Sequence, residues 1–285
     1  MFDFRAHFSS ICANGNARFL LQTLGQLPGG PKTISYQFHN YVEKENPVIR
    51  KFLVAATAAL LFVSSFAHAA IPWTLSNDTR YLAMGDSLAA GTGAIPVTQG
   101  YAYLLYRAGV FDTLTNTTFA DAGMPGATSA QVLAFQVPEA NIFQPEFVTI
   151  SVGGNDLLAI LLVGADPQTV LDAFEANLTK ILEGLRSDLP ENAVIIVGNQ
   201  YDIPEITDGI PGAKEVIAAF NFKIATVAAK PTTNARVADV FGAFGGFQGR
   251  NGLLLIERHG ANAFEVHPTN AGYRVMADAF AAAAQ

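Results

Sequence analysis

The chain has 285 residues, of which 50% are hydrophobic, and a formal net charge of −7. This length suits one globular α/β domain with an additional segment at the front, and the acidic balance gives no electrostatic footprint for nucleic acid. Cys12 is the only cysteine, so the chain cannot build a disulfide framework or a thiolate metal cluster.

An apolar run near the front of the chain indicates export. Arg50 and Lys51 precede an unbroken run of apolar and small residues over 52–66, and Ala67-His68-Ala69 follows it. A basic start, an apolar stretch and an Ala-x-Ala site are typical of a secretory signal peptide. The run of about fifteen residues is shorter than the roughly 20 that a retained membrane anchor, the alternative, would need. We therefore predict an exported protein, periplasmic or extracellular, with no stable membrane insertion after signal cleavage.

The segment ahead of this signal is unusual, because signal peptides normally begin a chain. Residues 1–47 show no clear periodicity, and Val48 would make an ordinary signal-peptide start. We interpret 1–47 as disordered or as an artefact of start-site choice, with Val48 read as an alternative initiator. The predicted organisation is then a signal peptide over 48–69 and one globular domain over 70–285, which is long enough to bury a single core.

Strand-like and helix-like segments alternate along the rest of the chain, which predicts a mostly parallel sheet with helices on both faces. The predicted strands span 80–84, 117–122, 147–152, 193–197 and 236–241. The predicted helices span 101–110, 129–135, 167–188, 213–229 and 271–284. In such sheets ligands bind beyond the carboxyl ends of the strands. Ser87, Gly123 and Asn155 each follow a predicted strand, so we expect them to share one rim of the sheet.

The first of these residues is a candidate nucleophile. Gly85-Asp86-Ser87-Leu88 comes directly after the first predicted strand, and the small residues 89–93 follow it. A serine in such a turn stands clear of its own secondary structure, and its small neighbours let a substrate approach the backbone closely. The alternative is an ordinary loop that ends a strand.

The second and third residues are candidate hydrogen-bond donors. Gly123 ends the second strand and could aim its backbone amide at a ligand; the alternative is an ordinary strand-to-helix turn. Gly153-Gly154-Asn155-Asp156 follows the third strand, and the Asn155 amide donates without carrying charge. Such donors stabilise the negative charge that develops on the carbonyl oxygen during acyl transfer. We expect Asp156 to cap the next helix.

A candidate general base lies near the other end of the chain. His267 precedes Pro268 and the predicted terminal helix, where it could take the serine proton and return it to a leaving group. His259 lies in a Gly-flanked loop and is interpreted as a surface residue.

Taken in chain order, Gly85-Asp86-Ser87-Leu88, Gly123, the 153–156 motif and His267-Pro268 resemble the SGNH hydrolases, also called GDSL esterases and lipases. The resemblance covers essentially the whole of 70–285. It implies a three-layer α/β/α fold resembling flavodoxin, with no metal or cofactor, and ester hydrolysis through an acyl-serine. By this resemblance Ser87 is the nucleophile and His267 is the base. The oxyanion hole consists of the Ser87 amide, the Gly123 amide and the Asn155 side chain.

One position departs from the family pattern. The usual acid is an aspartate three residues before the histidine, where this chain has Phe264. Glu265 stands two residues before His267 and is the expected orienting acid. A backbone carbonyl could instead hold the histidine tautomer.

The sequence gives fewer indications about the ester. The apolar stretch 157–163 could line an acyl pocket or begin a buried helix, and the loop over 242–263 is Gly-rich and apolar too. Both flank the expected site, which favours small-molecule or lipid esters with an apolar acyl part. Trp73, the only tryptophan, offers little for sugar stacking. The alternatives are a carbohydrate (acetyl) esterase and a non-catalytic exported binding protein on the same fold, and the oligomeric state stays open.

Overall fold

A computed structural model describes residues 79–112, 116–256 and 265–285 of the chain. The predictions for residues 1–47 and for the signal peptide over 48–69 lie outside the described residues. Those on Trp73, His259 and Phe264 also lie outside them.

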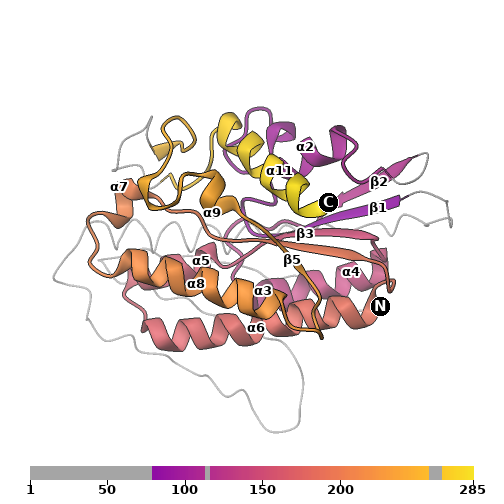
Figure 1. Cartoon of the computed structure of the whole chain (residues 1–285), viewed down its shortest axis with the longest axis horizontal. Helices are drawn as coiled ribbons and strands as arrows, with labels where there is room; N and C mark the ends of the chain where they lie inside the picture. Colours follow the sequence, from indigo (N-terminus) through magenta and orange to yellow (C-terminus); the bar gives the residue numbers. More distant parts are fainter. Residues whose placement is uncertain (1–78, 113–115, 257–264) are drawn as a thin grey trace, which may run out of the picture. The chain divides into compact units, whose positions relative to one another are not determined.

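The centre of the fold is a parallel sheet with the strand order β2-β1-β3-β4-β5 (Figure 1). The strands are β1 (Thr79–Gly85), β2 (Thr117–Asp121), β3 (Phe147–Ser151), β4 (Val194–Gly198) and β5 (Arg236–Ala238). The first described strand, β1, lies in the interior of the sheet; β2 pairs with it on one side and β3 on the other. This reversal creates a crevice beyond the carboxyl ends of β1 and β3, where ligands of such sheets bind.

Helices cover both faces of the sheet, as the sequence predicted (Figure 1). One face carries α3 (Ser129–Gln131), α4 (Val137–Phe143), α5 (Gly154–Val163), α6 (Pro167–Asp188) and α8 (Ala213–Ala228). The other face carries α2 (Tyr101–Arg107), α9 (Val240–Ala243) and α11 (Asn270–Ala284). Short helical turns complete the chain: η1 (Val97–Gln99), η2 (Val132–Gln136), α7 (Pro204–Thr207) and η3 (Gly246–Gln248).

The hydrophobic core therefore consists of two clusters, one on each side of the sheet. Alternate residues of β1 serve the two clusters, because successive side chains of a strand point to opposite faces. Leu82 and Met84 pack with the α6 side, where Phe174 is fully buried. Tyr81 packs with the α11 side, where Phe280 is fully buried. These two cores fix the sheet from both faces and hold the strand ends that carry the site.

The structure corrects three element boundaries. β5 ends at Ala238 rather than 241, because the Asp239 side chain accepts a hydrogen bond from the Gly242 amide and caps α9. The helix predicted over 129–135 continues through η2 and α4 to Phe143. α2 ends at Arg107 rather than 110, shortly before Gly109, whose φ is +65°.

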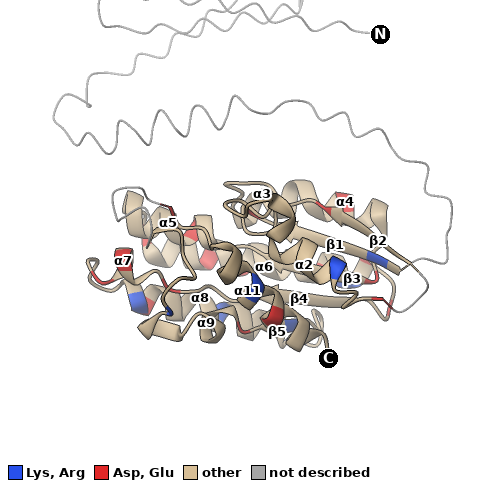
Figure 2. Cartoon of the chain, turned by 90° about the horizontal axis from the view of Figure 1, so that it is seen from above, with Lys and Arg blue, Asp and Glu red and all other residues tan. Residues whose placement is uncertain are grey.

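Charged side chains are scattered over the helices and loops in the view of Figure 2, with both signs interspersed. Among the described residues, none of the helices combines the length and the apolar character that crossing a membrane requires.

Candidate active site

Ser87 lies in a tight turn at the end of β1. Gly85 adopts a φ of +130°, and a Cβ on it would lie 1.9 Å from the carbonyl oxygen of Ser151, so only glycine fits. The next residue, Asp86, donates its backbone N–H to that same Ser151 oxygen at 2.9 Å. The Asp86 carboxylate then accepts the Leu88 amide at 2.9 Å and spans Ser87. This arrangement leaves the Ser87 side chain half-buried at the rim of the sheet.

His267 lies in a turn that is fastened to the chain segment before it. Leu254 and Pro268 form an antiparallel bridge. The Leu255 amide donates to the His267 carbonyl oxygen at 2.9 Å, and the Thr269 amide donates to Leu253 at 2.8 Å. Thr269 also caps α11 through the Gly272 amide at 3.2 Å. The histidine is therefore held by backbone pairing on one side and by a capped helix on the other.

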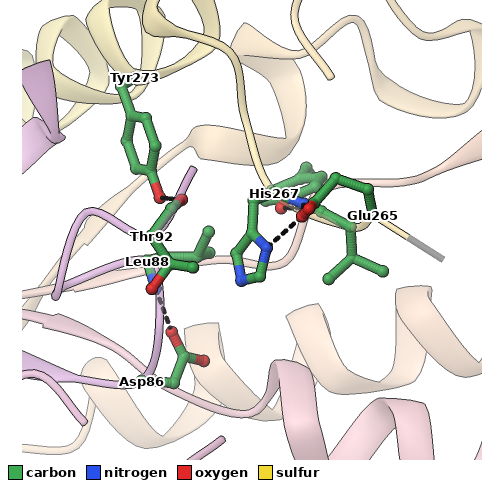
Figure 3. Close-up of polar contacts among 8 residues, drawn as sticks. Asp86, Leu88, Thr92, Glu265, His267 and Tyr273 are labelled. Atoms are coloured by element: carbon green, nitrogen blue, oxygen red, sulfur yellow. Dashed lines mark hydrogen bonds and ion pairs between the residues drawn. The ribbon is translucent and has the colours of Figure 1, made fainter. Parts of the chain in front are cut away.

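The serine turn and the histidine turn are in direct contact. The Tyr273 hydroxyl donates to the Thr92 carbonyl oxygen at 2.6 Å. Asn270 accepts the Ile95 amide at 2.9 Å and donates to the Ile95 carbonyl at 2.6 Å. A Cβ on Gly93 would lie 3.1 Å from Cβ of His267, so the two loops pack closely. Figure 3 shows the His267 ring between Glu265 and the loop that carries Leu88 and Thr92.

Glu265 contacts His267 directly. Its Oε1 pairs with Nδ1 of the imidazole and also accepts the His267 backbone N–H at 3.4 Å (Figure 3). The two side chains are 30% and 18% exposed, so solvent reaches the pair only in part. A carboxylate on Nδ1 favours the tautomer with hydrogen on that nitrogen, which leaves Nε2 as an acceptor. The structure thus offers His267 a carboxylate partner from the residue that the sequence put forward.

One small pocket is lined by Ser87, Asn155 and His267. Gly123, which was expected at the same rim as Ser87 and Asn155, does not line this pocket. No hydrogen bond joins Ser87 to His267 within the described part of the chain, which is common before substrate binds. Apolar side chains make up much of the wall: Leu88, Leu157, Leu158, Ile203 and Val266. Leu157 and Leu158 belong to α5, so the apolar stretch is both a helix and part of the wall.

The predicted oxyanion donors differ in availability. Within the described residues the Ser87 amide has no hydrogen-bond partner. Asn155 uses one N–H of its side chain on the Ala127 carbonyl oxygen at 2.9 Å, which orients the amide and leaves its second N–H for a ligand. The Gly123 amide instead donates to the Asp121 carboxylate at 2.8 Å. Gly123 is available to an oxyanion only when that contact opens.

Gly123 nevertheless lies against the serine turn. A Cβ on it would come within 2.4 Å of the Ala90 amide nitrogen, so glycine is required for this close approach. Further along the same loop, Gly126 has a φ of +83°, and its amide has no hydrogen-bond partner among the described residues. In the loop after β2, the Gly123 amide is therefore already hydrogen-bonded, whereas the Gly126 amide has no partner among the described residues.

The comparison with known families decides the assignment. The profile of the GDSL-like lipase/acylhydrolase family matches residues 83–275 of the chain. The chain belongs to the GDSL-like lipase/acylhydrolase family. A search of curated protein sequences found no match.

Solved structures agree with the family assignment. The lipase Lip_vut3 from a goat rumen metagenome is 25% identical with a TM-score of 0.59, covering 72% of this chain and 97% of that one. TesA is 24% identical with a TM-score of 0.52 and coverage of 70% and 95%. The acetylxylan esterase Axe2 from Geobacillus stearothermophilus shares the fold at 19% identity, with a TM-score of 0.55 and coverage of 72% and 94%. Family and fold together make this GDSL-like protein a carboxylic ester hydrolase rather than a non-catalytic binding protein.

Asp156 has a different role in this GDSL-like enzyme from the helix cap that the sequence predicted. It lies in the first turn of α5 and accepts hydrogen bonds from the Ser129 amide at 2.9 Å and the Ser129 hydroxyl at 2.7 Å. Asn177 donates to the same hydroxyl at 3.0 Å. Asp156 therefore ties the Asn155 turn to the start of α3, while Gly153 is the N-cap residue of α5.

Asp86 is a buried acid next to the serine. Burial raises the pKa of its carboxyl to about 7, and the hydrogen bond from the Leu88 amide opposes this in part. The carboxylate of Asp156 also raises the Asp86 pKa. The Gly-Asp-Ser motif points to the serine, whereas the burial of its aspartate depends on the packed fold.

Proposed function

We propose that this ester hydrolase acts through an acyl-serine intermediate on Ser87. Oγ of Ser87 attacks the ester carbonyl carbon while His267 takes its proton at Nε2. The tetrahedral intermediate then collapses, the bond to the alcohol oxygen breaks, and His267 returns the proton to the leaving alcohol. Water attacks the acyl-serine with His267 again as the base, which releases the acid and restores the serine. The observation that carries this proposal is the single pocket lined by Ser87, Asn155 and His267.

The charge on the carbonyl oxygen requires donors already in place. The Ser87 amide and the second N–H of Asn155 support this role, since neither is used elsewhere among the described residues. The predicted contribution of Gly123 requires its amide to leave Asp121. Glu265 would orient the imidazole and stabilise the imidazolium that forms in each step.

The wall of the pocket supports an ester with an apolar acyl part. Leu157, Leu158 and Ile203 line it, and apolar surface favours burying a hydrocarbon chain by roughly 0.8 kcal/mol per CH₂. This preference distinguishes longer acyl chains from acetate, which offers only a methyl group.

A carbohydrate esterase is the second candidate, favoured by a polar pocket next to the first. Asp202 and Pro204 line this second pocket, while their chain neighbours Tyr201 and Ile203 line the first. Glu205, Arg250 and Asn251 also line it, and such side chains can hydrogen-bond a hydroxyl-rich alcohol group.

The test is hydrolysis of p-nitrophenyl esters of increasing chain length by wild type and Ser87→Ala. We expect kcat/KM for butyrate or octanoate to exceed that for acetate by about tenfold or more, given the transfer energy of the added methylenes. Ser87→Ala should lose all activity above background, whereas Ser187→Ala, at an exposed serine, should not change it. A preference for acetylated xylo-oligosaccharides over every acyl ester in the series would favour the second candidate.

We also propose that the enzyme is exported, on the basis of the apolar run over 52–66 and the Ala-x-Ala site at Ala67–Ala69. Sequencing the N-terminus of the processed protein should give Ala70. A protein that retains residues 48–69 in the producing cell would contradict export by this signal.

A further inference from the structure

A buried glutamine holds the strand end that leads into the serine turn. Oε1 of Gln136 accepts the Gly85 amide at 2.7 Å, and its Nε2 donates to the Gly85 carbonyl oxygen at 2.8 Å. Gln136 is buried, with 2% of the residue exposed. Both polar atoms of its amide thus pair with the backbone of a single residue, two positions before Ser87.

The topology of the sheet explains why Gly85 needs such a partner. β2 pairs with β1 only as far as Ala83, whereas β3 continues to Gly85. Beyond Ala83 the edge of β1 has lost its neighbouring strand, although the Met124 amide, from the loop after β2, donates to the Gly85 carbonyl oxygen at 3.0 Å. A glutamine amide carries the same donor and acceptor as a peptide group. Gln136 therefore takes the place of the missing strand at the last residue of β1.

The local sequence explains why the Gln136 side chain points toward Gly85. The helix from Ser129 to Phe143 changes at η2 to a π-helical turn, in which the Val137 amide bonds to the Val132 carbonyl five residues earlier. Pro138 follows at once, and proline in a helix removes one N–H and crowds the preceding turn. A wider turn accommodates it, and such turns change the direction of the side chains they carry. Gln136 is the last residue of this turn.

We propose that Gln136 is a positioning residue for the nucleophile: its amide fixes Gly85, and Gly85 fixes the direction in which Ser87 leaves the strand. Gln136 does not itself line the catalytic pocket, so it acts through the backbone and not on the substrate. Gly85 has little freedom on its other side, where the Ser151 oxygen already excludes a Cβ. The glutamine thus completes a clamp from both sides. This inference rests on the proposed role of Ser87.

The test replaces the amide with an apolar group of similar length, Gln136→Met. A displaced nucleophile should lower kcat by about 10- to 100-fold, since an error of about 1 Å can cost a factor of this size, while KM changes little. The rate at which a fluorophosphonate labels Ser87 should fall by a similar factor, because labelling needs the nucleophile but not the ester pocket.

A matched control separates positioning from general loss of stability. Thr233 is also fully buried, and its hydroxyl bonds to Val227 and Ala228 at the end of α8. Thr233→Val should lower the melting temperature without changing kcat of the folded protein. If Gln136→Met does not fold, Gln136→Asn, whose amide is one methylene too short to reach, serves for the same comparison.

Amide hydrogen exchange tests the clamp independently of catalysis. The Gly85 N–H should exchange slowly in wild type and at least about tenfold faster in the variant. A folded Gln136→Met protein with kcat and labelling rate within about threefold of wild type would overturn the inference. So would a kcat loss of equal size in Thr233→Val, or an unprotected Gly85 amide in wild type. Absence of Ser87-dependent hydrolysis in wild type would instead refute the proposed function, while Gly85 exchange would still report on the clamp.

Discussion

The pair formed by Glu265 and His267 gives a quantitative prediction. Glu265→Gln keeps the size of the side chain and removes its charge. A hydrogen bond to a charged group contributes about 1.5–3 kcal/mol. Because 30% of the glutamate side chain is exposed, solvent screening places the value near the middle of that range, at about 2 kcal/mol. At 1.36 kcal/mol per factor of ten, kcat should fall about 30-fold.

The assay is steady-state hydrolysis of p-nitrophenyl butyrate, because the loss should appear in kcat rather than in KM. In the proposed mechanism, the imidazolium that Glu265 would stabilise forms in the transition states and is absent from the bound-substrate state. Glu191→Gln, at an exposed glutamate, serves as the control. A reduction of less than about tenfold would refute a strong role for Glu265, since a triad acid in a serine protease contributes about 10⁴.

Three further predictions concern the serine turn and its donor. Gly85→Ala should prevent stable folding, because its Cβ would meet the Ser151 oxygen at 1.9 Å; a soluble, active variant would disprove the close approach. Asn155→Ala should lower kcat by about 10²–10³, as for other oxyanion donors, and an unchanged kcat would exclude its side chain from that role. Asp86→Asn keeps an oxygen that can accept the Leu88 amide but removes a buried carboxyl group whose pKa is about 7. Since the folded pKa lies above the unfolded value of about 3.9, Asp86 lowers wild-type stability as pH rises from about 4 to 7, by at most about 4 kcal/mol. The variant should therefore gain stability relative to wild type over that window in urea unfolding, and a pH-independent difference would contradict the burial.

The long elements could be predicted because their signals are local. Asp166 and Pro167 mark the start of α6, which runs to Asp188 as expected, and the apolar strand runs predict the five-stranded sheet. The predicted strand over 236–241 was too long because apolar residues continue past Ala238. The observed end of β5 depends on the Asp239 side chain, which caps α9.

The residues of the candidate site likewise divide into those with a local sequence signal and those whose contacts depend on the packed fold. The candidate nucleophile Ser87 and the candidate base His267 could be named from their motifs, and the candidate acid Glu265 from its place two residues before the histidine. The contact between Asp121 and the Gly123 amide spans only two residues, so an Asx turn could have been suspected from the sequence. Gln136 could not be found, because its partner Gly85 is 51 residues away and the pairing depends on where β2 ends.

The most direct test of the account is to trap the acyl-enzyme. Acid quenching during turnover of p-nitrophenyl butyrate, followed by peptide mass mapping, should find one butyryl group on the peptide that contains Ser87. The same experiment with His267→Ala should find almost none. A butyryl group on another residue, or turnover with Ser87 unmodified throughout, would contradict the proposed mechanism.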